Sequence, residues 1–219
     1  MAKKKKAAPI VPVWVKHTWW LIPLLAVLVY IPAFNADFTL DDIPIIEENA
    51  YIHSLDKIPA IWTTHYWAGK IDANDTGLYR PLTLTTYNLQ YAISGKNAAA
   101  YHILNILLHA LVCLVLMKLV QLLFNDYKAV VITGVLFAVH PIHTEAVAGI
   151  VGRAELLASL FIITSMISYH HWRLNGGIKW LLLFMVSTFA AITSKEHGFL
   201  IAALLGLQEV YYFFTSKNF

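Results

Sequence analysis

The stretch that decides the fold is WWLIPLLAVLVYIPAF, residues 19–34, an uninterrupted apolar run behind the basic tail MAKKKK and Lys16. Basic residues ahead of a first apolar segment are typical of a cytoplasmic N-terminus. A cleaved signal peptide has the same order of features, but no convincing small-residue cleavage site follows, and the run is long for such a peptide. We therefore expect residues 1–18 to be a basic cytoplasmic tail and residues 19–34 to be a retained membrane helix.

The composition of the whole chain agrees with a membrane protein. Hydrophobic residues make up 58% of the 219 residues and charged residues only 13%, whereas soluble domains carry about 25% charged residues. Further apolar stretches lie near residues 100–124, 127–140, 154–170, 178–194 and 199–215. The sequence thus predicts an all-α membrane protein with about six transmembrane helices, five of them within 100–215. The run 127–140 is short for a span and is expected to tilt or to extend into 140–151.

Residues 35–99 form a polar loop too long for a simple turn. Ile52, Leu55, Ile58 and Trp62 recur at helical spacing, and Pro81 is well placed to begin a second helix. We predict an extracytoplasmic loop that carries amphipathic helices at the membrane interface. The alternative is a small folded cap without a ligand.

Charge is unevenly distributed across the predicted topology. Most lysines and arginines fall on the cytoplasmic side and most carboxylates on the other, and the basic bias supports this orientation. The net charge of +3 comes largely from the Lys3–Lys6 tail, so no nucleic-acid partner is expected. The single cysteine, Cys113, lies in an apolar run and is expected to be a buried residue outside any intramolecular disulfide.

Two short motifs in the outer loop contain charged residues that could take part in catalysis or ligand binding. Asp41 and Asp42 in LDD are adjacent carboxylates just beyond the first span, and one of them could act as a general base. Arg80 in YRP stands between an aromatic residue and a rigid turn, which suits bidentate binding of a phosphate or carboxylate. The alternatives are a solvated acidic loop, and for Arg80 a structural pair with Asp41 or Asp42.

Ionisable residues gather in HPIHTEAVAGIVGRAELLA, between two predicted spans: His140, His143, Glu145, Arg153 and Glu155. Such residues at membrane depth are costly, so a cluster predicts a site. The histidines and Glu145 could be metal ligands, but Pro141 disturbs their spacing, and ligands for a phosphate or a loop are favoured. No metal or other cofactor is therefore expected. Lys195 and Glu196 in SKEHG add a fourth motif on the same side.

These motifs, together with NAAAYHILNILLHA at 97–110 and FAVHPIHTEAVAGIVGRAELLA at 137–158, resemble the transmembrane and tetratricopeptide-repeat (TMTC) proteins. That family consists of O-mannosyltransferases of the GT-C fold. The resemblance covers residues 40–200. It implies transfer of a sugar, mannose in that family, from a polyprenyl-phosphate carrier to a protein Ser/Thr hydroxyl outside the cytoplasm. The host then sets the location: the plasma membrane in a bacterium, the endoplasmic reticulum in a eukaryote.

The resemblance also implies roles for the motif residues. Asp41 or Asp42 would be the base that activates the acceptor hydroxyl, and the carrier phosphate would be bound by Arg80, Arg153 and Lys195. The sugar or those cations would be oriented by His140, His143, Glu145 and Glu196, with Glu155 in the same binding set. Members of the family continue through further spans into tetratricopeptide repeats, so we expect this chain to be part of a longer one.

Two other function classes fit the same residues. A non-enzymatic membrane subunit could bind or transport a polyprenyl phosphate with these charges, although a transporter is expected to place its charges at the membrane midplane. A metal-dependent hydrolase could be built on His140, His143 and Glu145. The sequon at Asn74 lies in the predicted outer loop and could be glycosylated in a host that has the machinery.

Overall fold

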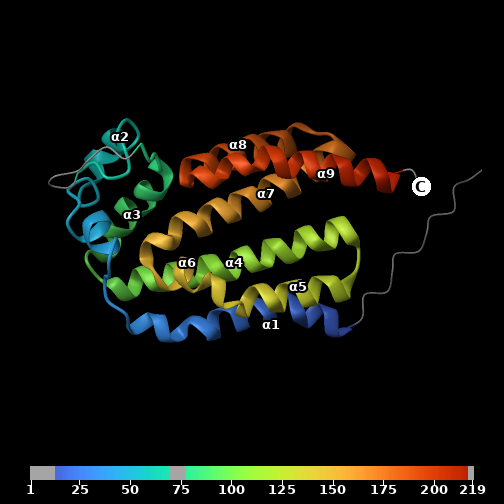
Figure 1. Ribbon diagram of the computed structural model, residues 1–219, viewed down its shortest axis with the longest axis horizontal. Coiled ribbons are helices and arrows are strands. Elements are labelled where there is room, and N and C mark those ends of the chain that lie inside the picture. Colours follow the sequence, from blue (N-terminus) through green and yellow to red (C-terminus); the bar gives the residue numbers. More distant parts are fainter. Residues whose placement is uncertain (1–12, 70–76, 217–219) are drawn as a thin grey trace, which may run out of the picture.

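The computed structural model describes residues 13–69 and 77–216, and every regular element in these ranges is helical. The sequon at Asn74 and residues 1–12 of the predicted basic tail lie outside the described residues, and the rest of that predicted tail belongs to the first helix, which begins at Val13. The longer helices run side by side along one direction (Figure 1). They are α1 (Val13–Tyr30), α4 (Ala98–Phe124), α5 (Tyr127–Val139), α7 (Arg153–Asn175), α8 (Ile178–Ser194) and α9 (Ile201–Ser216).

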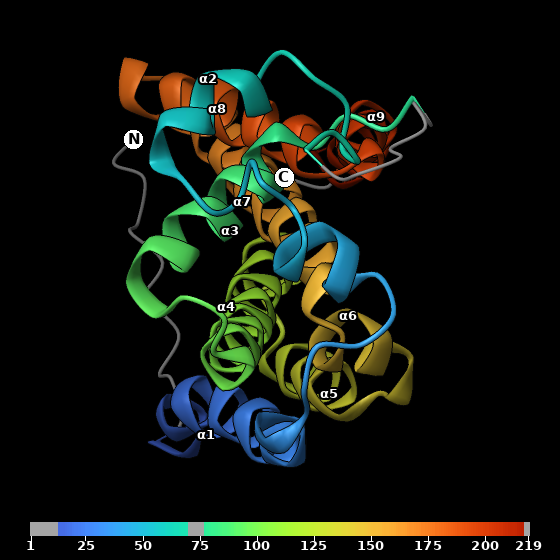
Figure 2. The ribbon, with the colours of Figure 1, turned by 90° about the vertical axis from the view of Figure 1, so that its left-hand side faces the viewer.

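Short elements gather at one end of this bundle, which is the end facing the viewer in Figure 2. The segment between α1 and α4 supplies η1 (Ile31–Asn35), η2 (Ile43–Glu47), η3 (Leu55–Lys57), α2 (Ile58–Ile61) and α3 (Pro81–Ser94). Breaks between the long helices supply η4 (Pro141–His143), α6 (Thr144–Ala148), η5 (Ile150–Gly152) and η6 (Glu196–Leu200). We call this end the cap end. The described chain begins and finishes at the opposite end.

The described part of residues 35–99 folds into a cap with its own core. Ile45, Ile46, Ile61 and Tyr87 are completely buried in it, and Ile150 joins them from η5. The helix predicted to begin at Pro81 is confirmed as α3. The stretch 52–62 contains less helix than its spacing indicates, because only the short elements η3 and α2 form there.

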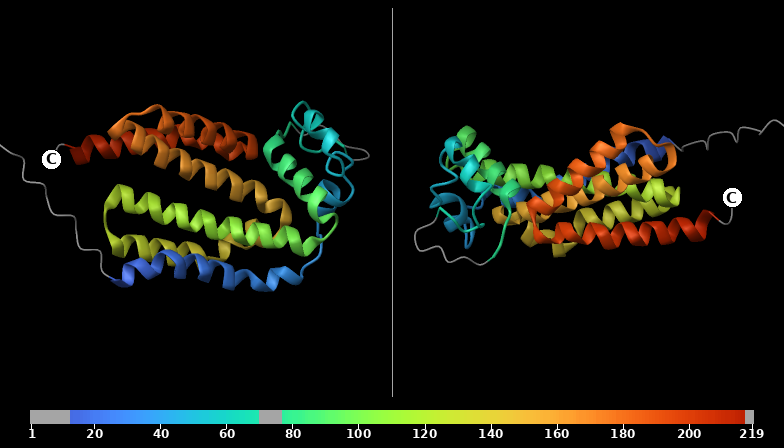
Figure 3. Two further views of the ribbon diagram at one scale, coloured as in Figure 1. Left: turned by 180° about the vertical axis from the view of Figure 1, so that it is seen from behind. Right: turned by 90° about the horizontal axis from the view of Figure 1, so that it is seen from above.

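The bundle packs as a series of neighbouring helices, visible in the left view of Figure 3. Helix α1 lies against α4 and α5, α4 lies against α7, and α7 lies against α8 and α9. Cys113 of α4 is buried, as expected, and its Sγ lies 3.4 Å from the Gly134 carbonyl oxygen of α5. Large apolar side chains such as Leu136 and Phe213 remain exposed on the outside, which suits lipid as the surrounding solvent.

The expected number of about six spans is not confirmed. Four helical stretches in the described residues are long and apolar enough to cross a bilayer, namely 16–35, 98–124, 150–175 and 196–215. Helix α5 and the η4–α6 segment form a bent pair at 48°, and α8 is a shorter apolar helix. By length and composition, four stretches of the described residues could cross a bilayer, or five if the bent pair forms one span. Pro141 explains the bend, since proline disturbs a continuing helix. The chain is a multi-pass membrane protein.

Candidate active site

A cavity of about 590 Å³ lies at the cap end, between the cap and the helices α4, α5 and α7. All four charged motifs contribute to its wall, although they are far apart in sequence. The predicted site residues that line it are Asp41, Asp42, Arg80, His143, Glu145, Glu155 and Lys195. The fold therefore brings together most of the residues that the sequence singled out, and it leaves His140, Arg153 and Glu196 outside the lining.

The two adjacent aspartates have opposite environments. Asp42 is 1% exposed, and its carboxylate accepts hydrogen bonds from the Thr39 N–H at 3.1 Å and the Val151 N–H at 2.8 Å. Asp41 is exposed, and its carboxylate forms no hydrogen bond or ion pair with any residue that the structure describes. Asp41 is thus available to an incoming group, whereas Asp42 holds the backbone around it.

The turn that carries these aspartates has an unusual backbone. Leu40 precedes Asp41 with φ of 48°, a left-handed conformation that is uncommon for a bulky residue. The Asp42 N–H donates to the Thr39 carbonyl at 2.9 Å and closes the turn around Leu40. Such strain persists where surrounding contacts fix it, as the hydrogen bonds of Asp42 do here.

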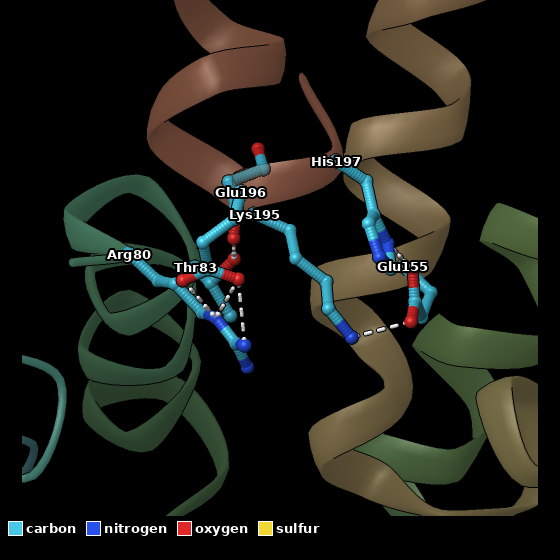
Figure 4. A network of polar contacts seen from close by, with 7 residues as sticks. Arg80, Thr83, Glu155, Lys195, Glu196 and His197 are labelled. Atoms are coloured by element: carbon cyan, nitrogen blue, oxygen red, sulfur yellow. Dashed lines mark hydrogen bonds and ion pairs between the residues drawn. The ribbon is translucent and has the colours of Figure 1, made fainter. Parts of the chain in front are cut away.

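Arg80 is held by Glu196, and not by either aspartate as one sequence interpretation proposed. Its Nε and Nη2 donate to the Glu196 carboxylate, at 3.0 and 2.8 Å (Figure 4). Burial lowers the pKa of Arg80, but the hydrogen bonds and charge of Glu196 raise it more, so its pKa lies above the ordinary value. The neighbouring Thr83 hydroxyl donates to the Ser194 carbonyl at 2.8 Å and fixes α3 against the end of α8. Glu196 therefore orients a permanently charged guanidinium at the cavity.

Tyr66 completes this corner of the cavity and was not predicted from the sequence. The guanidinium of Arg80 lies 4.8 Å from the centre of its ring. Burial raises the pKa of Tyr66 well above its ordinary value, so the phenol stays protonated. Its buried hydroxyl oxygen lies near the Arg80 guanidinium, which can only donate, and no described residue accepts its proton, which leaves an O–H donor for a bound molecule.

Lys195 is the second cation of the cavity wall, and Glu155 is its partner (Figure 4). The same carboxylate also contacts His197 Nδ1 at 3.1 Å. The turn that carries Lys195 depends on Gly198, where a Cβ atom would lie 2.4 Å from the Ala191 carbonyl carbon. His197 belongs to the SKEHG motif, but no role was predicted for it.

Histidine and aromatic rings form another part of the wall. The ring of His143 lies 4.3 Å from that of Phe137 and 5.4 Å from that of His109. His109 was missed as a lining residue, although a histidine within an apolar helix is a signal that could have found it. His140 is outside the lining, where its Nδ1 accepts a hydrogen bond from the Ile142 N–H at 3.2 Å.

Arg153 does not face the cavity. It is completely buried, and its Nε and Nη2 donate to Asn105 Oδ1 at 3.0 Å and Gln90 Oε1 at 2.6 Å. A carrier phosphate in the cavity could not reach a guanidinium enclosed in this way. The structure therefore argues against the predicted role of Arg153 as a ligand of the carrier phosphate.

The described residues contain no group of three His, Cys, Asp or Glu side chains close enough to hold a metal ion. His140, His143 and Glu145 are near in sequence but do not form such a group. The hydrolase interpretation thus gains no support from their arrangement.

Comparison with known proteins gives relatives that are named protein O-mannosyl-transferases. The chain is 36% identical to human protein O-mannosyl-transferase TMTC3, over 80% of this chain and 19% of that protein. It is 33% identical to human protein O-mannosyl-transferase TMTC2, over 88% of this chain and 24% of the relative. Mouse protein O-mannosyl-transferase TMTC4 is 30% identical over 91% of this chain and 29% of its own length.

The similarity covers most of this chain but only a part of each relative, because the matched region is between 19% and 29% of their length. No model of a protein family matches the chain. No solved structure matches it either. Over most of its length the chain is TMTC-like, related to the proteins named protein O-mannosyl-transferases TMTC2, TMTC3 and TMTC4.

Proposed function

We propose that the cap-end cavity transfers a mannosyl group from a polyprenyl-phosphate carrier to a serine or threonine hydroxyl of a protein on the extracytoplasmic side of the membrane. The observation that carries this proposal is the juxtaposition of an unpaired carboxylate, Asp41, with two cations, Arg80 and Lys195, in the wall of one cavity. The relatives' names support the sugar and the protein acceptor. In a eukaryotic host the compartment would be the endoplasmic reticulum.

The reaction is a substitution at the anomeric carbon of the mannose. The acceptor oxygen forms a bond to that carbon, while the bond between the carbon and the carrier phosphate oxygen breaks. Asp41 takes the proton of the acceptor hydroxyl, and the phosphate leaves with the electron pair of the broken bond. Charge therefore develops on the leaving phosphate, where fixed positive groups lower the barrier.

Arg80, Lys195 and the Tyr66 hydroxyl are the groups that would receive this charge. Arg80 keeps its position through Glu196, so it can accept a phosphate without losing its orientation. Lys195 would share its ammonium between Glu155 and the phosphate, since an ammonium has three donors. His143 and Glu145 lie in the same wall and would orient the sugar hydroxyls.

Asp41→Asn in the full-length protein tests the proposal. The protein is reconstituted in vesicles with radiolabelled polyprenyl-phosphate mannose and a protein acceptor. Removal of a general base is expected to lower transfer by about 10²- to 10⁴-fold. Asp37→Asn is the control, because Asp37 is an exposed acid of the same loop whose carboxylate accepts, among the described residues, only the Phe38 N–H.

Three results would count against the proposal in different ways. Wild-type transfer by Asp41→Asn would remove the base assignment. An equal loss in Asp37→Asn would show that the effect is not specific to the cavity. Binding of the labelled donor by the parent protein without any transfer would favour the non-enzymatic polyprenyl-phosphate-binding function.

A further inference from the structure

A buried polar network lies directly behind one wall of the cavity. The wall is formed by the backbone of residues 149–152, from which Gly149, Val151 and Gly152 face the cavity. Asn105 of α4 is completely buried, and its Nδ2 donates to the carbonyls of Gly149 and Ile150, at 3.0 and 3.1 Å. The Tyr87 hydroxyl donates to the same Ile150 carbonyl at 2.9 Å. These hydrogen bonds attach the wall to α4 and α3.

Arg153 determines which way the Asn105 amide points. A guanidinium can only donate, so its Nε at 3.0 Å requires Oδ1 of Asn105 on its side and directs Nδ2 to the wall. The guanidinium lies 4.6 Å from the ring centre of Tyr87, and no carboxylate pairs with it among the described residues. Burying an unpaired charge is costly, and an apolar side chain of similar volume is often more stable at such a place. A stability role alone therefore does not explain an arginine here.

The network reaches the aspartates through one backbone group. The Val151 N–H donates to Asp42 Oδ1 at 2.8 Å, and Asp42 also accepts the Thr39 N–H. The position of the strained turn that presents Asp41 thus depends on the position of the wall. Gly152 fixes the other side of the wall, because its Cα lies so near α6 that a Cβ would be 2.4 Å from the Ala146 carbonyl oxygen.

We propose that Asn105 and Arg153 are positioning residues that hold the 149–152 wall and, through Val151 and Asp42, place the Asp41 carboxylate at the cavity. Neither side chain contacts the reactants. The catalytic consequence rests on the proposed function, whereas the mechanical coupling between α4 and the aspartate turn does not.

Hydrogen–deuterium exchange of the full-length protein tests the coupling without any activity. Asn105→Ala and Arg153→Met should speed exchange in peptides covering residues 37–44 and 145–153 by roughly tenfold, because the wall loses its attachment. The control is Ser165→Ala, which removes a part-buried hydrogen bond between α7 and α8, to the Thr188 hydroxyl at 2.7 Å, about three helical turns along α7 from the wall. It should leave exchange in 37–44 unchanged.

Tyr87→Phe is a milder variant that keeps the ring and removes only the hydroxyl bond to Ile150. It should speed exchange in the same two peptides by less than Asn105→Ala, and it serves if the stronger variants do not fold. Unchanged exchange of residues 37–44 in Tyr87→Phe and in every folded variant of Asn105 or Arg153 would overturn the inference. Equal acceleration in Ser165→Ala would overturn it as well.

Kinetic measurements then distinguish a positioning role of Asn105 and Arg153 from a purely structural one. Misplacement of the base should lower kcat by roughly 10²-fold in Asn105→Ala and leave the KM for the donor nearly unchanged. Ser165→Ala should keep the parent kcat. Faster exchange with a parent kcat would overturn the catalytic part of the inference. If the parent protein transfers no mannose, the proposed function fails, and the exchange comparison still decides the coupling.

Discussion

At the scale of single residues, the adjacent Asp41 and Asp42 have different roles in the site. From the sequence, both were candidates for the general base, because two adjacent carboxylates cannot be distinguished without knowledge of their hydrogen bonds. The structure separates them by burial and by hydrogen bonding, since only Asp42 accepts backbone N–H groups. Asp42 is therefore structural in this arrangement, and Asp41 is the base in our proposal.

A stability comparison checks this difference in roles. Asp42→Ala leaves the Val151 and Thr39 N–H groups without their acceptor, which should lower the free energy of unfolding by about 1–3 kcal/mol. Asp41→Ala removes an exposed carboxylate without a partner among the described residues and should change that free energy by about 0.5 kcal/mol or less. Thermal unfolding in detergent measures both. Equal shifts for the two variants would contradict the difference in roles.

Hydrogen bonds and burial, which cannot be read from the sequence, also explain the outcome for the other predicted site residues. Both the cations and the acids could be named from the sequence, but the pairing of Arg80 with Glu196 and of Lys195 with Glu155 could not. These pairs connect the start of α3 with η6 and the end of α8 with α7, which lie far apart in the sequence. Arg153 was misplaced as a phosphate ligand because burial is not readable from one arginine in a motif. Nothing in the sequence indicated Tyr66, because its proposed role depends on burial and on a hydroxyl proton that no described residue accepts.

At the scale of elements, glycines allow the charged turns to pack closely against the helices. Gly198 sits in η6 against the backbone of Ala191, which cannot yield as a flexible side chain can. Helix α3 was predictable because proline marks its first turn. The short elements η3 and α2 were not, since the spacing of a few apolar residues fits a turn as well as a helix.

Gly198→Ala tests the role of this close contact. A Cβ would lie 2.4 Å from the Ala191 carbonyl carbon, so η6 must shift and carry Lys195 and Glu196 with it. We expect the unfolding free energy to fall by about 1–3 kcal/mol and mannosyl transfer to fall with it. Gly206→Ala is the matched control, because nothing lies within 4 Å of its added Cβ. It should be neutral or slightly stabilising in α9. Equal thermal stability of the two variants would show that the contact does not constrain η6.

At the scale of the whole molecule, the helices return to one end and bring four distant motifs together. Hydropathy and the lysine bias were sufficient to predict an all-helical membrane protein and to predict that these motifs gather at one end of its helices. They could not give the count of spans, because α5 and α8 are short and Pro141 bends the α5–α6 pair. The cavity itself is a product of packing between α4, α5, α7 and the cap, and no local pattern encodes it.

The most direct test of the account is the structure of the full-length protein in a lipid nanodisc with a non-reactive polyprenyl-phosphate mannose analogue. The account predicts that the phosphate lies in the cap-end cavity in contact with Arg80 and Lys195, that the sugar faces Asp41, and that this end is on the opposite side of the membrane from the N-terminus. A phosphate bound elsewhere, without contact to either cation, would contradict it.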